Sequence, residues 1–250
     1  MRPYFECEQG ILYHADCLDV LPTIDYDINM VFADLPYEET GNKWDKQLDL
    51  DLVFKQLESI VDDYVPLIFT GTFKFGVKLY NTAPHLYKYD WVWEKDNGTN
   101  APNVNLQPFR IHEQVYVFGK GRVTNGNRTA LTYNPQKTEG KPYSQKSGKV
   151  SENWKGGLKN IVTNNTSGLR HPKTIQKFAR DKVKLHSTQK PLGLVEYLIK
   201  TYSNENDIVL DFTAGSGTTA IACMNTNRKF ILVEQSKEYC DIIVKRIQQG

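Results

Sequence analysis

Short apolar runs alternate along the chain with stretches in which apolar residues recur every three or four positions. The runs at 29–33, 65–70 and 208–210 are rich in β-branched and aromatic residues, which is typical of strands buried on both faces. The stretches at 50–61 and 192–202 have helical spacing and predict amphipathic helices. Strands that alternate with helices favour an α/β fold with a mainly parallel sheet. The same periodicities predict further strands at 11–14, 89–93, 114–118 and 229–233, and further helical segments at 18–21, 73–81, 219–224 and 236–248.

The segment at 119–185 has a different character. Apolar periodicity fades there, and Gly, Asn, Thr, Ser, Lys and Tyr dominate. We expect an inserted module of low regular structure, which divides the chain into the ranges 1–118, 119–185 and 186–250. Aromatic residues such as Tyr143 and Trp154 are interleaved with its lysines. They suit stacking on bases or sugars, or else they form a small core of the insert itself.

Charge is unevenly distributed over the 250 residues, whose net charge is +2. Between Gly119 and Lys190 there are 16 lysines and arginines and 3 acidic residues, so the rest of the chain carries an acidic excess. A basic segment on an acidic body favours a polyanionic partner, most often nucleic acid. The alternative is a solvated insert whose lysines only keep it soluble.

The composition is that of an ordinary globular protein, with 40% hydrophobic and 24% charged residues. There is no run of eighteen apolar residues and no apolar signal core at the start, so we expect a cytoplasmic protein without a membrane partner. The four cysteines show no C-x-x-C spacing, which argues against a zinc knuckle or a redox motif. Cys17 and Cys223 lie in apolar surroundings typical of packing residues.

A glycine turn joins the predicted strand at 208–210 to the predicted helix at 219–224. The strand ends at Asp211, the turn contains Gly215-Ser216-Gly217, and the next strand ends at Glu234, 19 residues after Gly215. Glycine lets the backbone approach a ligand, the helix offers free N–H groups, and the acid can bind ribose hydroxyls. The pattern predicts a ligand that contains a nucleoside. A tight structural turn before a core helix is the alternative.

A second motif, Asp34-Leu35-Pro36-Tyr37, follows the strand at 29–33. Pro36 stiffens the turn, so a carboxylate, the Leu35 carbonyl and the Tyr37 ring are held in a fixed relation. A planar base that bears an amine needs these groups, because its two N–H groups need acceptors and its ring can stack. A helix-capping aspartate with a packed tyrosine is the alternative.

Acidic residues follow several of the predicted strands. In open parallel sheets the ligand crevice lies at the carboxyl ends of the strands, so Asp16, Asp34, Asp211 and Glu234 should border one crevice. Few residues follow Gly217, so most strands must come from the N-terminal part of the chain. The glycine unit should therefore be late in sequence but central in the sheet.

Together these motifs resemble those of the amino-methylating DNA methyltransferases, which methylate adenine N6 or cytosine N4 with S-adenosylmethionine. The family's catalytic motif, [DNS]-P-P-[YFW], corresponds to 34–37, and its cofactor motif, D-P-F-x-G-S-G-T-T, corresponds to 211–219. The segment at 186–191 is similar to the family's H-P-t-Q-K-P, and 112–120 resembles the strand after the catalytic half. The order of the motifs matches the β group, which implies that 119–185 is the target-recognition region.

The resemblance implies a doubly wound, mostly parallel, seven-stranded sheet of the Rossmann-like methyltransferase type. It also implies the roles of individual residues. The catalytic residues would be Asp34, Leu35, Pro36 and Tyr37. The residues that bind S-adenosylmethionine would be Asp16, Cys17, Thr188, Lys190, Asp211, Thr213, Ala214, Gly215, Ser216, Gly217, Thr218, Glu234 and Gln235. No metal is implied.

Three positions depart from the family pattern. Leu35 replaces a proline, Thr213 stands where phenylalanine is usual, and Ser187 replaces another proline. None of these changes removes a charged or hydrogen-bonding group. We therefore expect an active enzyme with a looser catalytic turn.

The expected reaction is direct methyl transfer to adenine N6 in a flipped-out base, assisted by Asp34. The chain has no Pro-Cys dipeptide, so a covalent cysteine route to cytosine C5 has no nucleophile. Asp in the first motif position favours adenine, whereas N4-cytosine methylation is the nearest alternative. An RNA or protein amide substrate and a catalytically silent module that binds NAD are further alternatives. DNA is the expected partner of a monomer or homodimer, with a restriction endonuclease as a candidate second partner.

Overall fold

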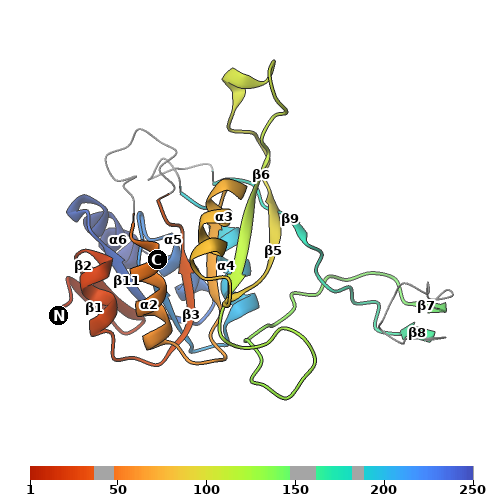
Figure 1. Cartoon of the computed structure of the whole chain (residues 1–250), viewed down its shortest axis with the longest axis horizontal. Coiled ribbons are helices and arrows are strands. Elements are labelled where there is room, and N and C mark those ends of the chain that lie inside the picture. Colours follow the sequence, from red (N-terminus) through yellow and green to blue (C-terminus); the bar gives the residue numbers. More distant parts are fainter. Residues whose placement is uncertain (37–47, 147–161, 182–188, 250) are drawn as a thin grey trace. The chain divides into compact units, whose positions relative to one another are not determined.

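The computed structural model describes residues 1–36, 48–146, 162–181 and 189–249. Nine strands form one sheet in the order β1-β2-β11-β10-β3-β4-β6-β5-β9 (Figure 1). Its strands are β1 (Phe5–Cys7), β2 (Gly10–His14), β3 (Ile28–Ala33), β4 (Leu67–Gly71), β5 (Tyr87–Glu94), β6 (His112–Phe118), β9 (Ile175–Lys177), β10 (Ile208–Asp211) and β11 (Lys229–Glu234). The helices are α1 (Cys17–Val20), η1 (Leu21–Thr23), α2 (Leu50–Ile60), α3 (Phe73–Thr82), η2 (Ala101–Asn103), α4 (Leu192–Tyr202), α5 (Thr218–Asn225) and α6 (Lys237–Gln249).

The centre of the sheet combines strands from both ends of the chain. Strands β2, β11, β10, β3 and β4 are parallel, and β10 lies between β11 and β3. Strand β6 is antiparallel to both β4 and β5. The predicted mostly parallel sheet, with the late glycine unit at its centre, is therefore confirmed. The short edge strands β1 and β9 add to the seven strands expected from the sequence.

Helices cover both faces of the sheet. Helices α1, α2 and α3 contribute Val20, Val53, Leu57 and Leu79 to one core, whereas α4, α5 and α6 contribute residues such as Leu198 to the other. Strand residues alternate between these cores because successive side chains point to opposite faces. In β3, for example, the side chains of Val31 and Ala33 belong to the first core, and those of Met30 and Phe32 belong to the second. This arrangement is the doubly wound architecture that the family resemblance implies.

Side-chain caps set the starts of the helices near the carboxyl ends of the strands. Asp16 accepts a hydrogen bond from the Leu18 N–H at the start of α1, and Thr72 accepts one from the Phe75 N–H in α3. Helix α4 begins after Pro191, and Asp181 accepts a hydrogen bond from its first N–H, that of Leu192. These capped ends fix the directions in which the adjoining loops leave the sheet.

Among the described residues, no helix combines the length and apolar character needed to cross a membrane.

The chain divides into two compact units, Met1–Asn134 with Thr174–Gly250, and Pro135–Lys173. In the second unit, β7 (Tyr143–Lys146) pairs with β8 (Val162–Asn165) in an antiparallel ladder, and Arg170 lies over the Tyr143 ring. The second unit covers a shorter range of residues than the insert expected at 119–185. Residues 119–134 pack with the first unit, where the Asn134 N–H donates to the Thr201 carbonyl. Trp154 lies outside the described residues.

Candidate active site

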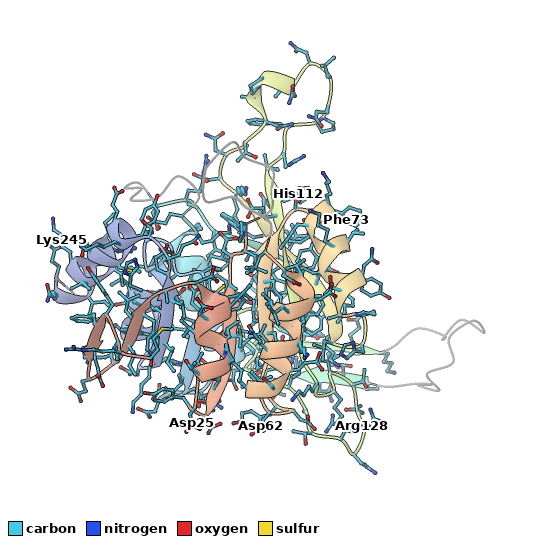
Figure 2. The ribbon with its side chains drawn as sticks, turned by 60° about the vertical axis from the view of Figure 1, so that its left-hand side comes forward. Asp25, Asp62, Phe73, His112, Arg128 and Lys245 are labelled. Atoms are coloured by element: carbon cyan, nitrogen blue, oxygen red, sulfur yellow. The ribbon has the colours of Figure 1, made fainter. Side chains whose placement is uncertain are left out.

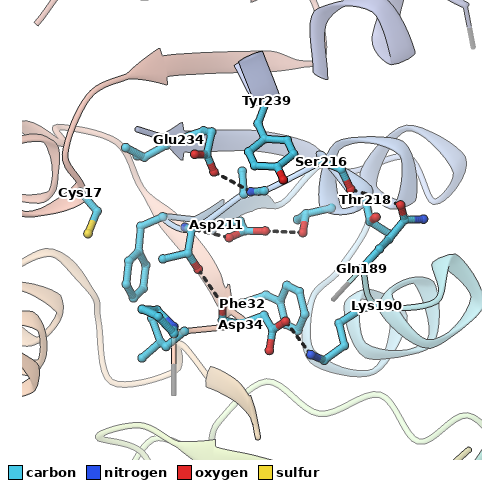
Figure 3. A pocket seen from close by; sticks show the side chains of 18 of the residues that line it. Cys17, Phe32, Asp34, Gln189, Lys190, Asp211, Ser216, Thr218, Glu234 and Tyr239 are labelled. Atoms are coloured by element: carbon cyan, nitrogen blue, oxygen red, sulfur yellow. Dashed lines mark hydrogen bonds and ion pairs between the residues drawn. The ribbon is translucent and has the colours of Figure 1, made fainter. Parts of the chain in front are cut away.

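A cavity of ≈ 800 Å³ lies beyond the carboxyl ends of β3 and β10, where the order of the parallel strands reverses. A parallel sheet opens a crevice at such a point, because the connections leave in opposite directions. Side chains from both segments of the first unit line the walls, among them Lys190 and the acids Asp16, Asp34, Asp211 and Glu234, of which Figure 3 labels all but Asp16. The expected crevice, bordered by four acids from different strand ends, is therefore present.

Most of the predicted site residues meet at this cavity. Tyr37 and Thr188 lie outside the described residues. Of the others, Gly217 is absent from the cavity wall. The residues that line the cavity are Asp16, Cys17, Asp34, Leu35, Pro36, Lys190, Asp211, Thr213, Ala214, Gly215, Ser216, Thr218, Glu234 and Gln235.

Asp34 is held from three sides. Its Oδ2 accepts a hydrogen bond from Lys190 Nζ at 2.5 Å, and its Oδ1 accepts one from Thr70 Oγ1 at 2.7 Å. Its backbone carbonyl accepts a hydrogen bond from Thr213 Oγ1 at 3.4 Å. The Thr213 hydroxyl, which replaces the family's phenylalanine, therefore ties the glycine-turn segment to the catalytic turn. The Asp34 carboxylate is 21% exposed and lines the cavity.

A chain of alternating charges extends behind Asp34. Lys190 Nζ also lies 3.5 Å from Glu113 Oε2, and Glu113 Oε1 pairs with Lys95. Lys190 and Lys95 are only 8% and 5% exposed. Burial opposes ionisation of Glu113, but the two lysines outweigh it and hold the pKa of this carboxyl below its usual range.

Sequence reasoning missed Lys95, Glu113 and Thr70. Glu113 pairs with Trp93 across the β5–β6 ladder, and Lys95 follows β5 directly. The sequence does show an acid just before one predicted strand and a lysine just after another. Whether these two side chains meet depends on the register of the strands, which the apolar pattern alone did not define.

Asp211 has no cation beside it among the described residues. Its Oδ1 accepts a hydrogen bond from the Thr213 N–H at 3.1 Å, and its Oδ2 accepts one from Thr219 Oγ1 at 2.5 Å. Burial raises the pKa of Asp211 to about 7, and the charges of Asp34 and Glu234 add to this effect. Asp211 therefore connects the start of the glycine-turn segment to the start of α5.

The absence of a side chain matters for different reasons at the two glycines of the turn. Both have left-handed backbone angles, with φ of +53° at Gly215 and +77° at Gly217. A Cβ at Gly215 would meet no described atom within 4 Å, so this position opens onto the cavity. A Cβ at Gly217 would lie 2.7 Å from Ile243, so this position lets α6 pack closely.

Glu234 joins the turn to the next strand end. Its Oε2 accepts a hydrogen bond from the Gly215 N–H, and its Oε1 accepts one from the Ser236 N–H, both at 2.8 Å. Burial raises the pKa of Glu234. The carboxylate is thus fixed at the cavity wall with lone pairs left for hydroxyl donors.

The remaining wall offers further groups to a polar ligand. Thr218 Oγ1 is buried, and no described atom hydrogen-bonds to it, so a ligand could satisfy it. Tyr239, in α6, is half-buried and lines the cavity. Burial raises the pKa of Cys17 to about 12, so its thiol is neutral and a poor nucleophile. Over the described residues there is no His, Cys, Asp or Glu cluster suited to a metal ion.

These features fit a nucleoside with an attached charged chain. The fixed carboxylate of Glu234 suits ribose hydroxyls, and the open turn at Gly215 admits a ligand to the backbone. The volume is within the range of small-molecule sites, roughly 300–1,000 Å³. The orphaned hydroxyl of Thr218 provides one more polar contact.

The family model for N6/N4-type enzymes, described as DNA methylase, matches residues 28–245. Type II methyltransferase M2.LlaDCHI from Lactococcus lactis subsp. cremoris is 26% identical over 283 residues, covering 100% of this chain and 93% of the relative. Orphan methyltransferase M.BamHII from Bacillus amyloliquefaciens is 35% identical over 162 residues, covering 63% of this chain and 60% of the relative.

Solved structures show the same fold. M1.HpyAVI, in a complex with S-adenosylmethionine, has a TM-score of 0.65 at 23% identity, covering 95% of this chain and 99% of the other. The cytosine-N4-specific PvuII DNA methyltransferase has a TM-score of 0.67 at 15% identity, covering 98% of this chain and 88% of the other. The family match extends from β3 to α6 and includes both motifs, which argues against a module that binds NAD. The chain therefore belongs to the N6/N4 DNA methylase family and is an S-adenosylmethionine-dependent DNA methyltransferase.

Proposed function

We propose that this enzyme methylates the exocyclic N6 of adenine in a base turned out of the DNA duplex. The setting of Asp34 carries the proposal, because this carboxylate reaches the cavity while Lys190 and Thr70 hold it in place. An ionised carboxylate only accepts hydrogen bonds, which suits it to the N–H groups of an amine. Asp in this motif position favours adenine by family resemblance, since serine is commoner in the cytosine-N4 group.

The proposed chemistry starts from the weakness of the amine as a nucleophile, whose lone pair conjugates with the ring of the base. Asp34 and the Leu35 carbonyl accept hydrogen bonds from the two N–H groups of the amine, which draws electron density to the nitrogen and aims its lone pair at the methyl group. S-adenosylmethionine supplies an electrophilic methyl group when it is bound. The cavity walls position the amine and exclude water from the transfer. Once the new N–C bond has formed, the nitrogen releases its extra proton to solvent. Tyr37 remains the candidate for stacking on the base.

We assign cofactor contacts to the opposite wall of the cavity. Glu234 would bind the ribose hydroxyls, and Asp16 would accept a hydrogen bond from the adenine amine, with Cys17 and Gln235 beside it. The segment from Gly215 to Thr218 would hold the methionine part. Lys190 was expected at the cofactor, and its contact with Asp34 also gives it a part on the catalytic side.

The identity of the modified base tests the proposal. The enzyme would be produced in cells that lack adenine and cytosine DNA methylation, and the nucleosides would be measured by mass spectrometry. We expect N6-methyladenine, absent when the Asp34→Ala variant is produced at the same level. N4-methylcytosine would instead support the alternative represented by the PvuII enzyme, which is similar in fold. Sequencing of the same DNA would give the recognition site.

The basic range at 119–185 is the proposed DNA-binding region. Exposed lysines such as Lys137, Lys141 and Lys146 belong to its compact part, Pro135–Lys173. Replacing these three by glutamine should lower the slope of log affinity against log salt by about one unit for each lost phosphate contact. An unchanged slope would remove this range from the DNA interface.

Because several relatives are type II methyltransferases, we also propose that the enzyme works with a restriction endonuclease.

A further inference from the structure

The loop between β5 and β6, residues 95–111, carries apolar side chains on its outside. Leu106 is 88% exposed, and Val104, Phe109 and Ile111 are also exposed. No other large apolar side chain of the described residues is as exposed as Leu106. In Figures 1 and 2 this loop projects beyond the strands, with His112 at its base. Such exposure has an energetic cost in water, so it calls for an explanation.

The loop is held in one conformation by its own contacts. Asn100 Nδ2 donates to the Pro108 carbonyl at 3.0 Å, and Asn100 Oδ1 accepts from the Arg110 N–H at 2.6 Å. The Leu106 N–H donates to the Asn103 carbonyl at 2.9 Å within the turn that follows η2. These bonds close the neck of the loop and keep the Leu106 side chain outside. A preformed projection binds with less loss of conformational entropy than a loose one.

The charge of the loop differs from that of the basic range at 119–185. No charged residue occurs between Asp96 and Arg110, and the exposed positions include Asn103, Asn105 and Gln107. Asparagine and glutamine amides can pair with base edges, whereas phosphate contacts come mainly from lysine and arginine. A neutral tip of amides around one apolar side chain therefore suits the base stack of DNA better than its backbone.

The loop also adjoins the cavity that would receive the target base. Thr99 and Arg110, at its neck, line the cavity that contains Asp34. Lys95, the first residue of the loop, and Glu113, which follows the loop in β6, belong to the charged chain behind Asp34. The projection therefore starts at the cavity wall. A second copy of the chain is a weaker occupant, because a few side chains on one loop fall short of the ~800 Å² that each partner usually buries.

We propose that Leu106 enters the DNA stack beside the target base and fills the space which that base leaves when it turns into the cavity. The proposal rests on the proposed function. Apolar side chains that wedge between base pairs offset part of the unstacking free energy. Asn105 and Gln107 contact the neighbouring base edges, and Arg110 faces a phosphate near the neck.

The experiment compares two duplexes that contain the methylated site found by sequencing. In one the target base is paired, and in the other it faces an abasic site and is already unpaired. We expect Leu106→Ala to slow methylation of the paired duplex about tenfold or more, because flipping costs a few kcal/mol. On the abasic duplex the variant should be within twofold of the unaltered enzyme. Tyr26→Ala is the matched control, since Tyr26 is also an exposed large side chain and precedes the amino end of β3.

Three outcomes would overturn the inference. The first is an unchanged rate of Leu106→Ala on the paired duplex, and the second is an equal loss on both duplexes. The third is a change from dimer to monomer in the variant, measured by light scattering, which would assign the loop to a second copy. If the unaltered enzyme methylates neither duplex, the proposed function fails instead. Affinity for S-adenosylmethionine, measured by calorimetry, shows that each variant is folded.

Discussion

Asp34 and Asp211 both lie at the carboxyl ends of neighbouring strands but have opposite surroundings. Asp34 follows β3, Asp211 ends β10, and the two strands are parallel neighbours. The Asp34 carboxylate is partly exposed and paired with Lys190, which Glu113 helps to hold. Asp211 is buried, with the Thr219 hydroxyl and the Thr213 N–H as its hydrogen-bond donors, and its pKa is raised to about 7 by burial.

The difference shows that a place at a strand end does not decide what a carboxylate does. Asp34 is paired with a lysine and lines the cavity, so its side chain is placed where a ligand can meet it. Burial among neutral donors makes Asp211 an internal brace of the glycine-turn segment, and its raised pKa lets the protonated form persist up to about pH 7. Substitutions that remove one feature at a time can therefore test the comparison.

The largest effect is expected at Asp34. Asp34→Ala removes the proposed acceptor, so methyl transfer should fall by about a thousandfold, the upper range for loss of one positioned polar group. Binding of S-adenosylmethionine should be retained, because its proposed contacts come from other strand ends. Transfer of a radiolabelled methyl group to DNA and calorimetry with the cofactor measure the two properties.

Asp34→Asn is the matched variant, because it keeps one acceptor oxygen but loses the ion pair with Lys190. It should be more active than Asp34→Ala and less active than the unaltered enzyme. Near-normal transfer by Asp34→Ala would show that this carboxylate is not the acceptor. Loss of cofactor binding would mean that the two sides of the cavity are not separable.

A smaller effect is expected at Glu113, which acts through Lys190. Glu113→Gln removes the charge that both buried lysines face, so Lys190 should hold Asp34 less firmly. We expect kcat to fall by up to about a hundredfold, as for a misplaced group, with little change in cofactor affinity. Steady-state kinetics at several cofactor concentrations separates kcat from KM.

Glu94→Gln is the control for this prediction. Glu94 lies at the same end of the β5–β6 ladder, but it pairs with the exposed Lys177. It should leave kcat unchanged, because exposed ion pairs contribute little. If Glu113→Gln keeps full kcat, or loses it only through unfolding seen in thermal melts, Glu113 does not position Asp34.

The sequence predicted the sheet and both motif acids, but not the environment of those acids. Apolar periodicity is sufficient for buried strands, and the late glycine unit required a central β10. The Lys95–Glu113 pair depends on the register of β5 and β6, and the separate roles of Gly215 and Gly217 depend on where α6 packs. Neither relation is local in the sequence, so spacing alone could not predict them.

The smallest effect concerns Asp211 and the pH dependence of stability. Its pKa is about 7 in the folded protein and close to the ordinary value of 3.8 after unfolding. Between these two pH values the folded state binds one more proton than the unfolded state. The free energy of unfolding therefore falls as pH rises from about 4 to about 7, and this loss of stability is complete above pH 7. From pH 5 to pH 8 this amounts to about 2–3 kcal/mol.

Asp211→Asn should remove this dependence, because the amide oxygen can still accept from the Thr213 N–H and the side chain stays neutral. Urea unfolding at pH 5 and pH 8 measures the effect. The stability of the variant relative to the unaltered protein should rise by about 2–3 kcal/mol between the two pH values. Asp62→Asn, at an exposed acid, should show no such change. An equal difference at both pH values would mean that Asp211 is ionised throughout, and the contrast with Asp34 would then rest on geometry alone.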